Sequence, residues 1–144
     1  MSMKKVIIII FLVLIVLNKQ ICFANEQIKI KLVKIIDGDT IIGKIDKNEF
    51  EIRLIGLDCF ETSKINRAYK QAYNENLSID EVVKKGNFAK NYVKDLYKQS
   101  EKNVYLEFKG LDTYKRVLRI LYFGTLNINN ELINKNICNV YNYK

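Results

Sequence analysis

The chain has 144 residues and carries 24 Lys and Arg against 16 Asp and Glu, a net charge of +8 at pH 7. It contains no His, which excludes His general acid–base catalysis, Ser-His and Cys-His nucleophile pairs and His-containing zinc sites. Catalysis would therefore depend on carboxylates, Arg, Lys and Tyr, with or without a hard metal ion. The positive charge suits a polyanionic partner, but an excess of Lys also occurs in proteins that bind no nucleic acid.

The first 24 residues have the order of a secretory signal peptide. Lys4 and Lys5 precede an unbroken apolar run at residues 6–17, and Ala24 supplies the small residue before a cleavage site. The run is shorter than the ~20 residues that a membrane-spanning helix needs, which favours cleavage over an uncleaved anchor. We expect residues 1–24 to be removed and residues 25–144 to form one domain of a secreted or periplasmic protein.

Alternating or β-branched segments predict five strands, taken here in chain order. Residues 27–37, 40–45 and 50–57 follow this pattern, and turn signals at 37–39 and 46–49 separate them. Residues 103–108 and 116–123 give two further strands, joined by a loop at 109–115.

Helix signals lie between the third and fourth strands and near the end of the chain. Ser78 and Glu81 form a capping box before apolar residues at helical spacing, which predicts a helix to about Gln99. A short helix is expected at 130–135, with Asn136 closing it in the left-handed conformation. Residues 63–77 are polar with no strong period, so we expect them to be irregular.

This order of elements is typical of the OB-fold, a five-stranded Greek-key barrel. The predicted fold class is α+β, mainly β, with two or three helices. Such barrels commonly bind oligonucleotides, but a fold by itself does not establish a function.

Acidic residues follow strands at what we expect to be one end of the barrel. Asp39 follows the first turn, Asp58 ends the third strand and Glu61 lies three residues later. Two carboxylates and a backbone carbonyl make an oxygen-only site suited to Ca²⁺, although acids at strand ends are also common as solvated turn residues. Arg53 interrupts apolar residues of the third strand, which fits either a phosphate contact or an exposed ion pair with a Glu.

The chain resembles the staphylococcal nuclease family in four motifs that occur in the family's order. They are Asp37-Gly38-Asp39-Thr40, the run from Arg53 to Thr62, Asp112-Thr113-Tyr114-Lys115-Arg116, and Tyr141-Asn142-Tyr143.

This resemblance implies a calcium site and a catalytic carboxylate. Asp39 and Asp58 match the carboxylate ligands of Ca²⁺, and the backbone carbonyl of Cys59 matches a third ligand. Glu61 matches the glutamate that orients or deprotonates the attacking water.

The resemblance also implies the groups that hold the substrate. Arg53 and Arg116 match two arginines that grip the scissile phosphate. Tyr114 matches a contact to the terminal phosphate, and Tyr141 and Tyr143 match aromatic residues near the nucleotide base.

The function implied is that of an exported, Ca²⁺-dependent nuclease. It would cleave DNA and/or RNA with little sequence preference, leave 3′-phosphate ends, and act as a monomer without a stable protein partner. The alternatives are a catalytically inactive, nucleic-acid-binding OB domain and an exported barrel that binds a protein or glycan.

Several positions depart from the family pattern or leave alternatives open. Phe60 replaces the family's proline and removes a rigid residue from the loop that carries Glu61. Lys115 stands where a glycine is common. Residues 65–77 are either a solvated insertion, which we favour, or a basic, aromatic rim over the groove. Cys59 and Cys138 can form a disulfide in an exported protein, but their spacing does not require one.

Overall fold

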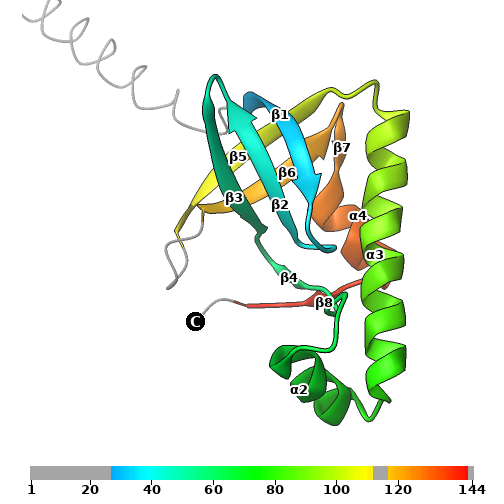
Figure 1. The fold of residues 1–144 in the computed structure, drawn as a ribbon. Helices are drawn as coiled ribbons and strands as arrows, with labels where there is room; N and C mark the ends of the chain where they lie inside the picture. Colours follow the sequence, from blue (N-terminus) through cyan, green and yellow to red (C-terminus); the bar gives the residue numbers. More distant parts are fainter. Residues whose placement is uncertain (1–26, 112–116, 143–144) are drawn as a thin grey trace, which may run out of the picture.

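The computed structural model describes residues 27–111 and 117–142, in which three helices flank a β-barrel (Figure 1). The elements are β1 (Gln27–Ile35), β2 (Thr40–Ile45), β3 (Asn48–Leu54), β4 (Leu57–Asp58), α2 (Asn66–Glu75), α3 (Ile79–Gln99), β5 (Val104–Leu111), β6 (Val117–Phe123), β7 (Leu126–Asn127), α4 (Ile128–Asn134) and β8 (Asn139–Val140). Within these described residues, no helix has both the length and the apolar character needed to cross a membrane.

Five of the strands close the barrel. β1 pairs antiparallel with β2 and β5, β2 pairs with β3, and β5 pairs with β6. A parallel pairing of β3 with β6, in which Arg53 lies opposite Leu118, joins the two edges of the sheet. The predicted five-stranded OB-fold barrel is therefore confirmed, with three helices around it.

Aliphatic side chains fill the barrel, because successive residues of a strand point to opposite faces of the sheet. The most buried members of this core include Ile41, Ile52, Leu54, Leu106 and Leu121. Ala89 and Val93 of α3 and Ile128 and Leu132 of α4 belong to the same buried cluster. The core thereby fixes both helices against the barrel, and with them the strand ends that carry the acidic residues.

The long helix begins and ends where the sequence predicts. Ser78 is the N-cap of α3, and both hydrogen bonds of the capping box with Glu81 are present. Asn136 takes the expected left-handed conformation after α4, with φ 53°. α4 itself begins at Ile128, two residues earlier than predicted, because the Asn127 side chain caps it by accepting a hydrogen bond from the backbone N–H of Asn130 at 3.0 Å.

The expectation of an irregular segment at 63–77 is wrong, because residues 66–75 form α2. The buried face of this helix consists of Ala68 and Ala72, whose small side chains give little hydrophobic signal. Tyr69 and Tyr73, the larger residues, are exposed. Ile65 at the N-cap makes no capping hydrogen bond through its side chain, so the usual start signal is also missing.

The third predicted strand is divided in the structure. β3 ends at Leu54, and Gly56 reverses the chain with φ 84°, a conformation that favours glycine. The separate strand β4 pairs with β8, so that Asp58 lies opposite Asn139. β5 also runs three residues further than predicted, to Leu111.

Candidate active site

The turn between β1 and β2 places Asp39 inside the protein. The Asp37 carboxylate accepts a hydrogen bond from the Asp39 backbone N–H at 3.1 Å, which closes the turn locally. A Cβ on Gly38 would lie 2.7 Å from the Cys59 sulfur and 2.8 Å from the Cβ of Ala89, so only glycine fits there without displacement. The Asp39 side chain is therefore held at the barrel end, 1% exposed.

Arg53 connects the acidic residues of the two motifs. Its Nη1 donates to Asp39, and its Nη2 donates to the Asp58 Oδ1 at 3.1 Å. Nη1 also lies 3.3 Å from the Thr40 hydroxyl, on the residue that opposes Arg53 across the β2–β3 pair. The alternative of an exposed Arg–Glu pair is wrong, because Arg53 is 5% exposed and its partners are these aspartates.

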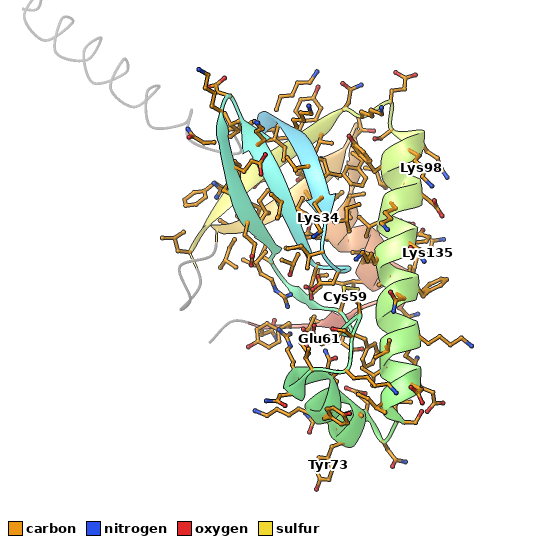
Figure 2. All side chains as sticks on the ribbon, in the orientation of Figure 1. Lys34, Cys59, Glu61, Tyr73, Lys98 and Lys135 are labelled. Carbon is orange, nitrogen blue, oxygen red and sulfur yellow. A yellow bond between two sulfur atoms is a disulfide. The ribbon has the colours of Figure 1, made fainter. Side chains whose placement is uncertain are left out.

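A disulfide and a short strand pair hold the second motif. Cys59 is bonded to Cys138, which resolves the alternative that the sequence left open. The Cys59 backbone N–H donates to Asp39 Oδ2 at 2.7 Å, which joins the two motifs directly. Figure 2 shows Cys59 and Glu61 on the segment between the barrel and α2.

Glu61 lies beside α2, partly shielded from solvent. Its Oε1 is 3.2 Å from the Nε of Arg67, and its backbone N–H donates to the Gln71 side chain at 3.0 Å. Burial raises the pKa of the Glu61 carboxyl above its ordinary value, and the charges of Asp37 and Asp58 raise it further, against the lowering effect of Arg67.

Among the described residues, four carboxylates and two guanidinium groups form this cluster: Asp37, Asp39, Asp58, Glu61, Arg53 and Arg67. Burial raises the pKa of Asp37, and this effect exceeds the lowering by the nearby Arg53 charge. With every member ionised, the carboxylates exceed the guanidinium groups by about two charges. This part of the site is therefore short of positive charge.

The donor set fits a hard divalent cation. Carboxylate and carbonyl oxygens are the ligands that Ca²⁺ prefers. Asp39, Asp58 and the Cys59 carbonyl belong to one cluster, and that carbonyl keeps a second lone pair beside the hydrogen bond that it accepts from Gln71 at 3.0 Å. Within the described ranges no three acidic or sulfur side chains already stand as a metal-ligand group. The aspartate oxygens hold arginine N–H groups instead.

Of the remaining predicted site residues, the structure describes Tyr141 alone. Tyr114, Arg116 and Tyr143 lie outside the described residues. The Tyr141 backbone N–H donates to the carbonyl of Gly56 at 3.0 Å, just beyond the β4–β8 pair, and its side chain is 46% exposed. The structure thus brings Tyr141 to the end of the barrel that carries the acidic cluster.

Three residues of the site received no role from the sequence: Asp37, Arg67 and Gln71. Arg67 was expected in a solvated insertion, but it pairs with both Asp58 and Glu61. The sequence did contain one signal that Arg67 and Gln71 act together. Arg67 and Gln71 are four residues apart, so on a helix they share one face. That signal required the helix to be recognised first.

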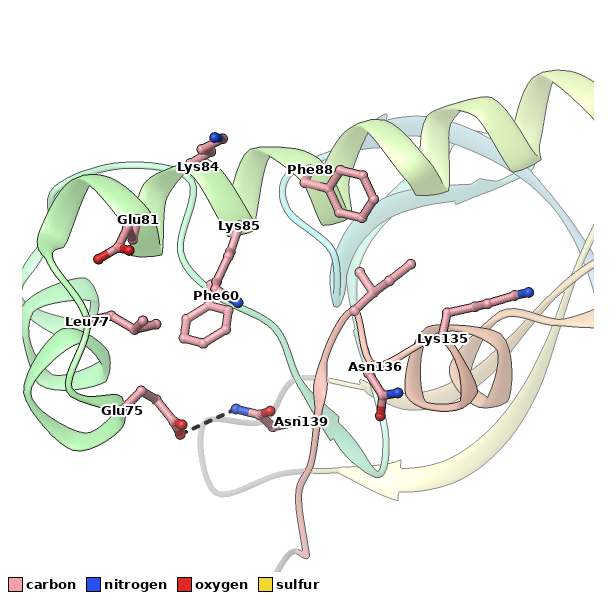
Figure 3. Close-up of a pocket in the computed structure, with 11 residues that line it drawn as sticks. Phe60, Glu75, Leu77, Glu81, Lys84, Lys85, Phe88, Lys135, Asn136 and Asn139 are labelled. Carbon is pink, nitrogen blue, oxygen red and sulfur yellow. Dashed lines mark hydrogen bonds between the residues drawn. The ribbon is translucent and has the colours of Figure 1, made fainter.

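A hollow of about 600 Å³ is lined by Phe60 and by residues of α3 and of the segment after α4 (Figure 3). Its lining combines three lysines with two glutamates, Glu75 and Glu81, and with apolar side chains that include the buried Phe60. Lys85 Nζ lies 5.6 Å from the centroid of the Phe60 ring. The acidic cluster is not part of its lining.

Comparison with known proteins gives two relatives of similar identity. The chain is 31% identical over 119 residues to an uncharacterized endonuclease of Haemophilus influenzae, which covers 82% of this chain and 55% of that protein. It is 30% identical over 123 residues to a thermonuclease of Staphylococcus hyicus, which covers 84% of this chain and 63% of the relative. The matches span about three fifths of the relatives' length.

The profile of a protein family, described as staphylococcal nuclease homologue, matches residues 51–144. This range is well over half of the chain and includes Arg53, Asp58 and Glu61, which the structure brings together. The barrel, the order of the motifs and this match agree, and the chain belongs to the staphylococcal nuclease family.

Proposed function

We propose that this protein is a Ca²⁺-dependent nuclease that hydrolyses phosphodiester bonds of DNA and/or RNA with little sequence preference. The observation that carries the proposal is one connected cluster at one end of an OB-fold barrel. In it Asp39 and Asp58 pair with Arg53, and Asp58 and Glu61 pair with Arg67. The relatives described as a thermonuclease and an endonuclease support it.

In this proposal Asp39, Asp58 and the Cys59 carbonyl hold the Ca²⁺ ion. When bound, the ion supplies positive charge that stabilises the negative charge built up at phosphorus during the attack. The excess of carboxylates in the cluster supports a role in binding a divalent cation. Glu61 orients the attacking water or accepts its proton, and the leaving group is the 5′-oxygen, so the product carries a 3′-phosphate.

Arg53 and Arg116 bind the scissile phosphate, since a planar guanidinium can donate to two phosphate oxygens at once. Among the described residues the buried Nε of Arg53 has no hydrogen-bond partner, and an unsatisfied buried donor is costly. A phosphate oxygen would satisfy it. Tyr114, Tyr141 and Tyr143 complete the substrate site by phosphate contact and by stacking, which tolerates any base.

The protein is further proposed to act outside the cytoplasm as a monomer, after cleavage near Ala24. The Cys59–Cys138 disulfide supports this location, because disulfides persist in oxidising compartments such as the periplasm and the extracellular space.

Degradation of nucleic acid should require calcium. We expect supercoiled plasmid and single-stranded RNA to be degraded with millimolar Ca²⁺ and to stay intact with a chelator, as read on gels. The comparison of the two substrates also ranks DNA against RNA. Substrate that stays intact but shifts in mobility with Ca²⁺ present would contradict the proposal and favour a nucleic-acid-binding domain without catalysis.

Replacing Arg53 by alanine should lower kcat/KM by about a hundredfold or more, the scale of one lost charge-stabilising donor. Arg53→Lys keeps the charge but not the two-pronged geometry, so it should recover only part of the loss. Lys47 is an exposed residue of the turn between β2 and β3. Lys47→Ala removes one positive charge there and serves as the matched control in the same steady-state assay. Equal activities for Arg53→Ala and Lys47→Ala would remove Arg53 from the site.

A further inference from the structure

α2 lies directly over the residues that carry the proposed chemistry. We call residues 58–62, which run from the last residue of β4 toward α2, the reactive loop. Arg67 and Gln71, one helical turn apart, both contact this loop. Ala68 and Ala72, which follow these two residues in sequence, pack in a small buried cluster with Phe60 of the same loop and with Val82 of α3.

Gln71 binds the backbone of the reactive loop with both ends of its amide. Its Oε1 accepts from the backbone N–H of Glu61 at 3.0 Å, and its Nε2 donates to the backbone carbonyl of Cys59 at 3.0 Å. One side chain thus satisfies two loop groups that lie two residues apart, as a neighbouring strand would do. This single amide therefore restrains the spacing between the Cys59 carbonyl and the Glu61 N–H.

Arg67 binds the side chains of the same loop. Its Nη2 donates to Asp58 Oδ1, and its Nε lies 3.2 Å from Glu61 Oε1. The Arg67 guanidinium lies between the two carboxylates and holds them close together by pairing with each of them. The Arg67 side chain is 41% exposed, so it reaches the cluster from the solvent side of the loop.

The other side of the reactive loop rests on α3 without clearance. A Cβ on Gly86 would lie 2.2 Å from the Glu61 carbonyl oxygen, so α3 and the loop backbone are in direct contact. Asn87 donates to the carbonyl of Thr62 at 3.2 Å. The far end of α2 is tied down as well, since Asn139 donates to Glu75 at 3.4 Å (Figure 3).

From these contacts we propose that α2 is a positioning element for catalysis, in which Gln71 sets the backbone and Arg67 sets the carboxylates of the reactive loop. The inference rests on the proposed nuclease function. It accounts for Phe60 in place of a rigid proline, because side chains of a neighbouring helix restrain the loop from outside. The only side chains that α2 buries are those of two alanines, which remove little apolar surface from water. The contacts of α2 with the loop therefore hold the loop in position more than they add to a hydrophobic core.

The first test is Gln71→Met, which keeps length and helix propensity but removes both hydrogen bonds. We expect the Glu61 amide to exchange its hydrogen about fivefold faster in NMR experiments, the effect of one lost hydrogen bond. We expect kcat to fall about 10–100-fold, as for lost partners of active-site ligands, while KM stays unchanged. Lys70→Ala, on the exposed side of α2, is the control and should change none of these quantities.

The second test is Arg67→Ala compared with Arg67→Lys. Alanine should lower kcat about 10–100-fold with KM retained, and lysine should restore part of the lost kcat, because it keeps a charge between the carboxylates.

Unchanged Glu61 exchange and unchanged kcat in Gln71→Met would overturn the proposal. Amide exchange needs no turnover, so it decides the role of α2 even if the wild-type protein fails to cleave nucleic acid and the proposed function is wrong.

Discussion

Replacing Glu61 by glutamine is expected to lower kcat about 10²–10⁴-fold, the usual contribution of a positioned general base. Glutamine has the same shape, can still accept the hydrogen bond from Arg67, and leaves the backbone bond to Gln71 in place. Only the negative charge and the basicity are lost. KM should therefore change little, because Glu61 is not proposed to bind the substrate.

The experiment compares steady-state kinetics on a short oligonucleotide for the wild type, Glu61→Gln and Glu101→Gln. Glu101 is an exposed residue of the turn that joins α3 to β5, and no contact joins it to the reactive loop among the described residues. The control removes the same charge and should match the wild type. A Glu61→Gln protein within tenfold of the control would exclude the carboxylate from the chemical step.

Reduction of the Cys59–Cys138 disulfide is expected to remove about 2–5 kcal/mol of stability. The bond joins residues separated by 79 positions, so it restricts a long loop of the unfolded chain. A domain of this size has a total stability on the order of 5–15 kcal/mol, and the reduced protein should therefore be near the limit of folding. The bond also ties β4 and β8 together beside Asp58.

The measurement is equilibrium guanidinium unfolding with and without a thiol reductant. The double variant Cys59→Ala/Cys138→Ala is the matched control, because the reductant has no bond to break in it. We expect the reductant to lower the midpoint of the wild type and to leave that of the double variant unchanged. Equal shifts in both proteins would mean that the disulfide contributes nothing to stability.

The sequence predicted those parts of the fold whose signals are local. The capping box at Ser78 needs only residues that are neighbours in the chain, and α3 follows it as expected. The five barrel strands were found because alternating or β-branched apolar segments stand between turn signals in the sequence. The helix α2 was missed because its buried residues, Ala68 and Ala72, are too small to produce a hydrophobic period.

For the site, the sequence determined which residue types are present and in what order. The absence of His, the acidic residues after the strands and the family motifs pointed to Asp39, Arg53, Asp58 and Glu61. The structure brings these four residues into one cluster. The roles of all the predicted site residues remain predictions. Tyr114, Arg116 and Tyr143 also lie outside the described residues.

Only the tertiary structure decided which groups pair, because pairing depends on distances that barrel closure and helix packing set. The β3–β6 closure and the turn at Gly38 place Arg53 between Asp39 and Asp58, which lie 14 and 5 residues away in the chain. The same packing places Cys59 next to Cys138, where they form a disulfide, and places Arg67 next to Glu61. The sequence by itself determined the chemistry available to this protein, and the folded chain decided how it is arranged.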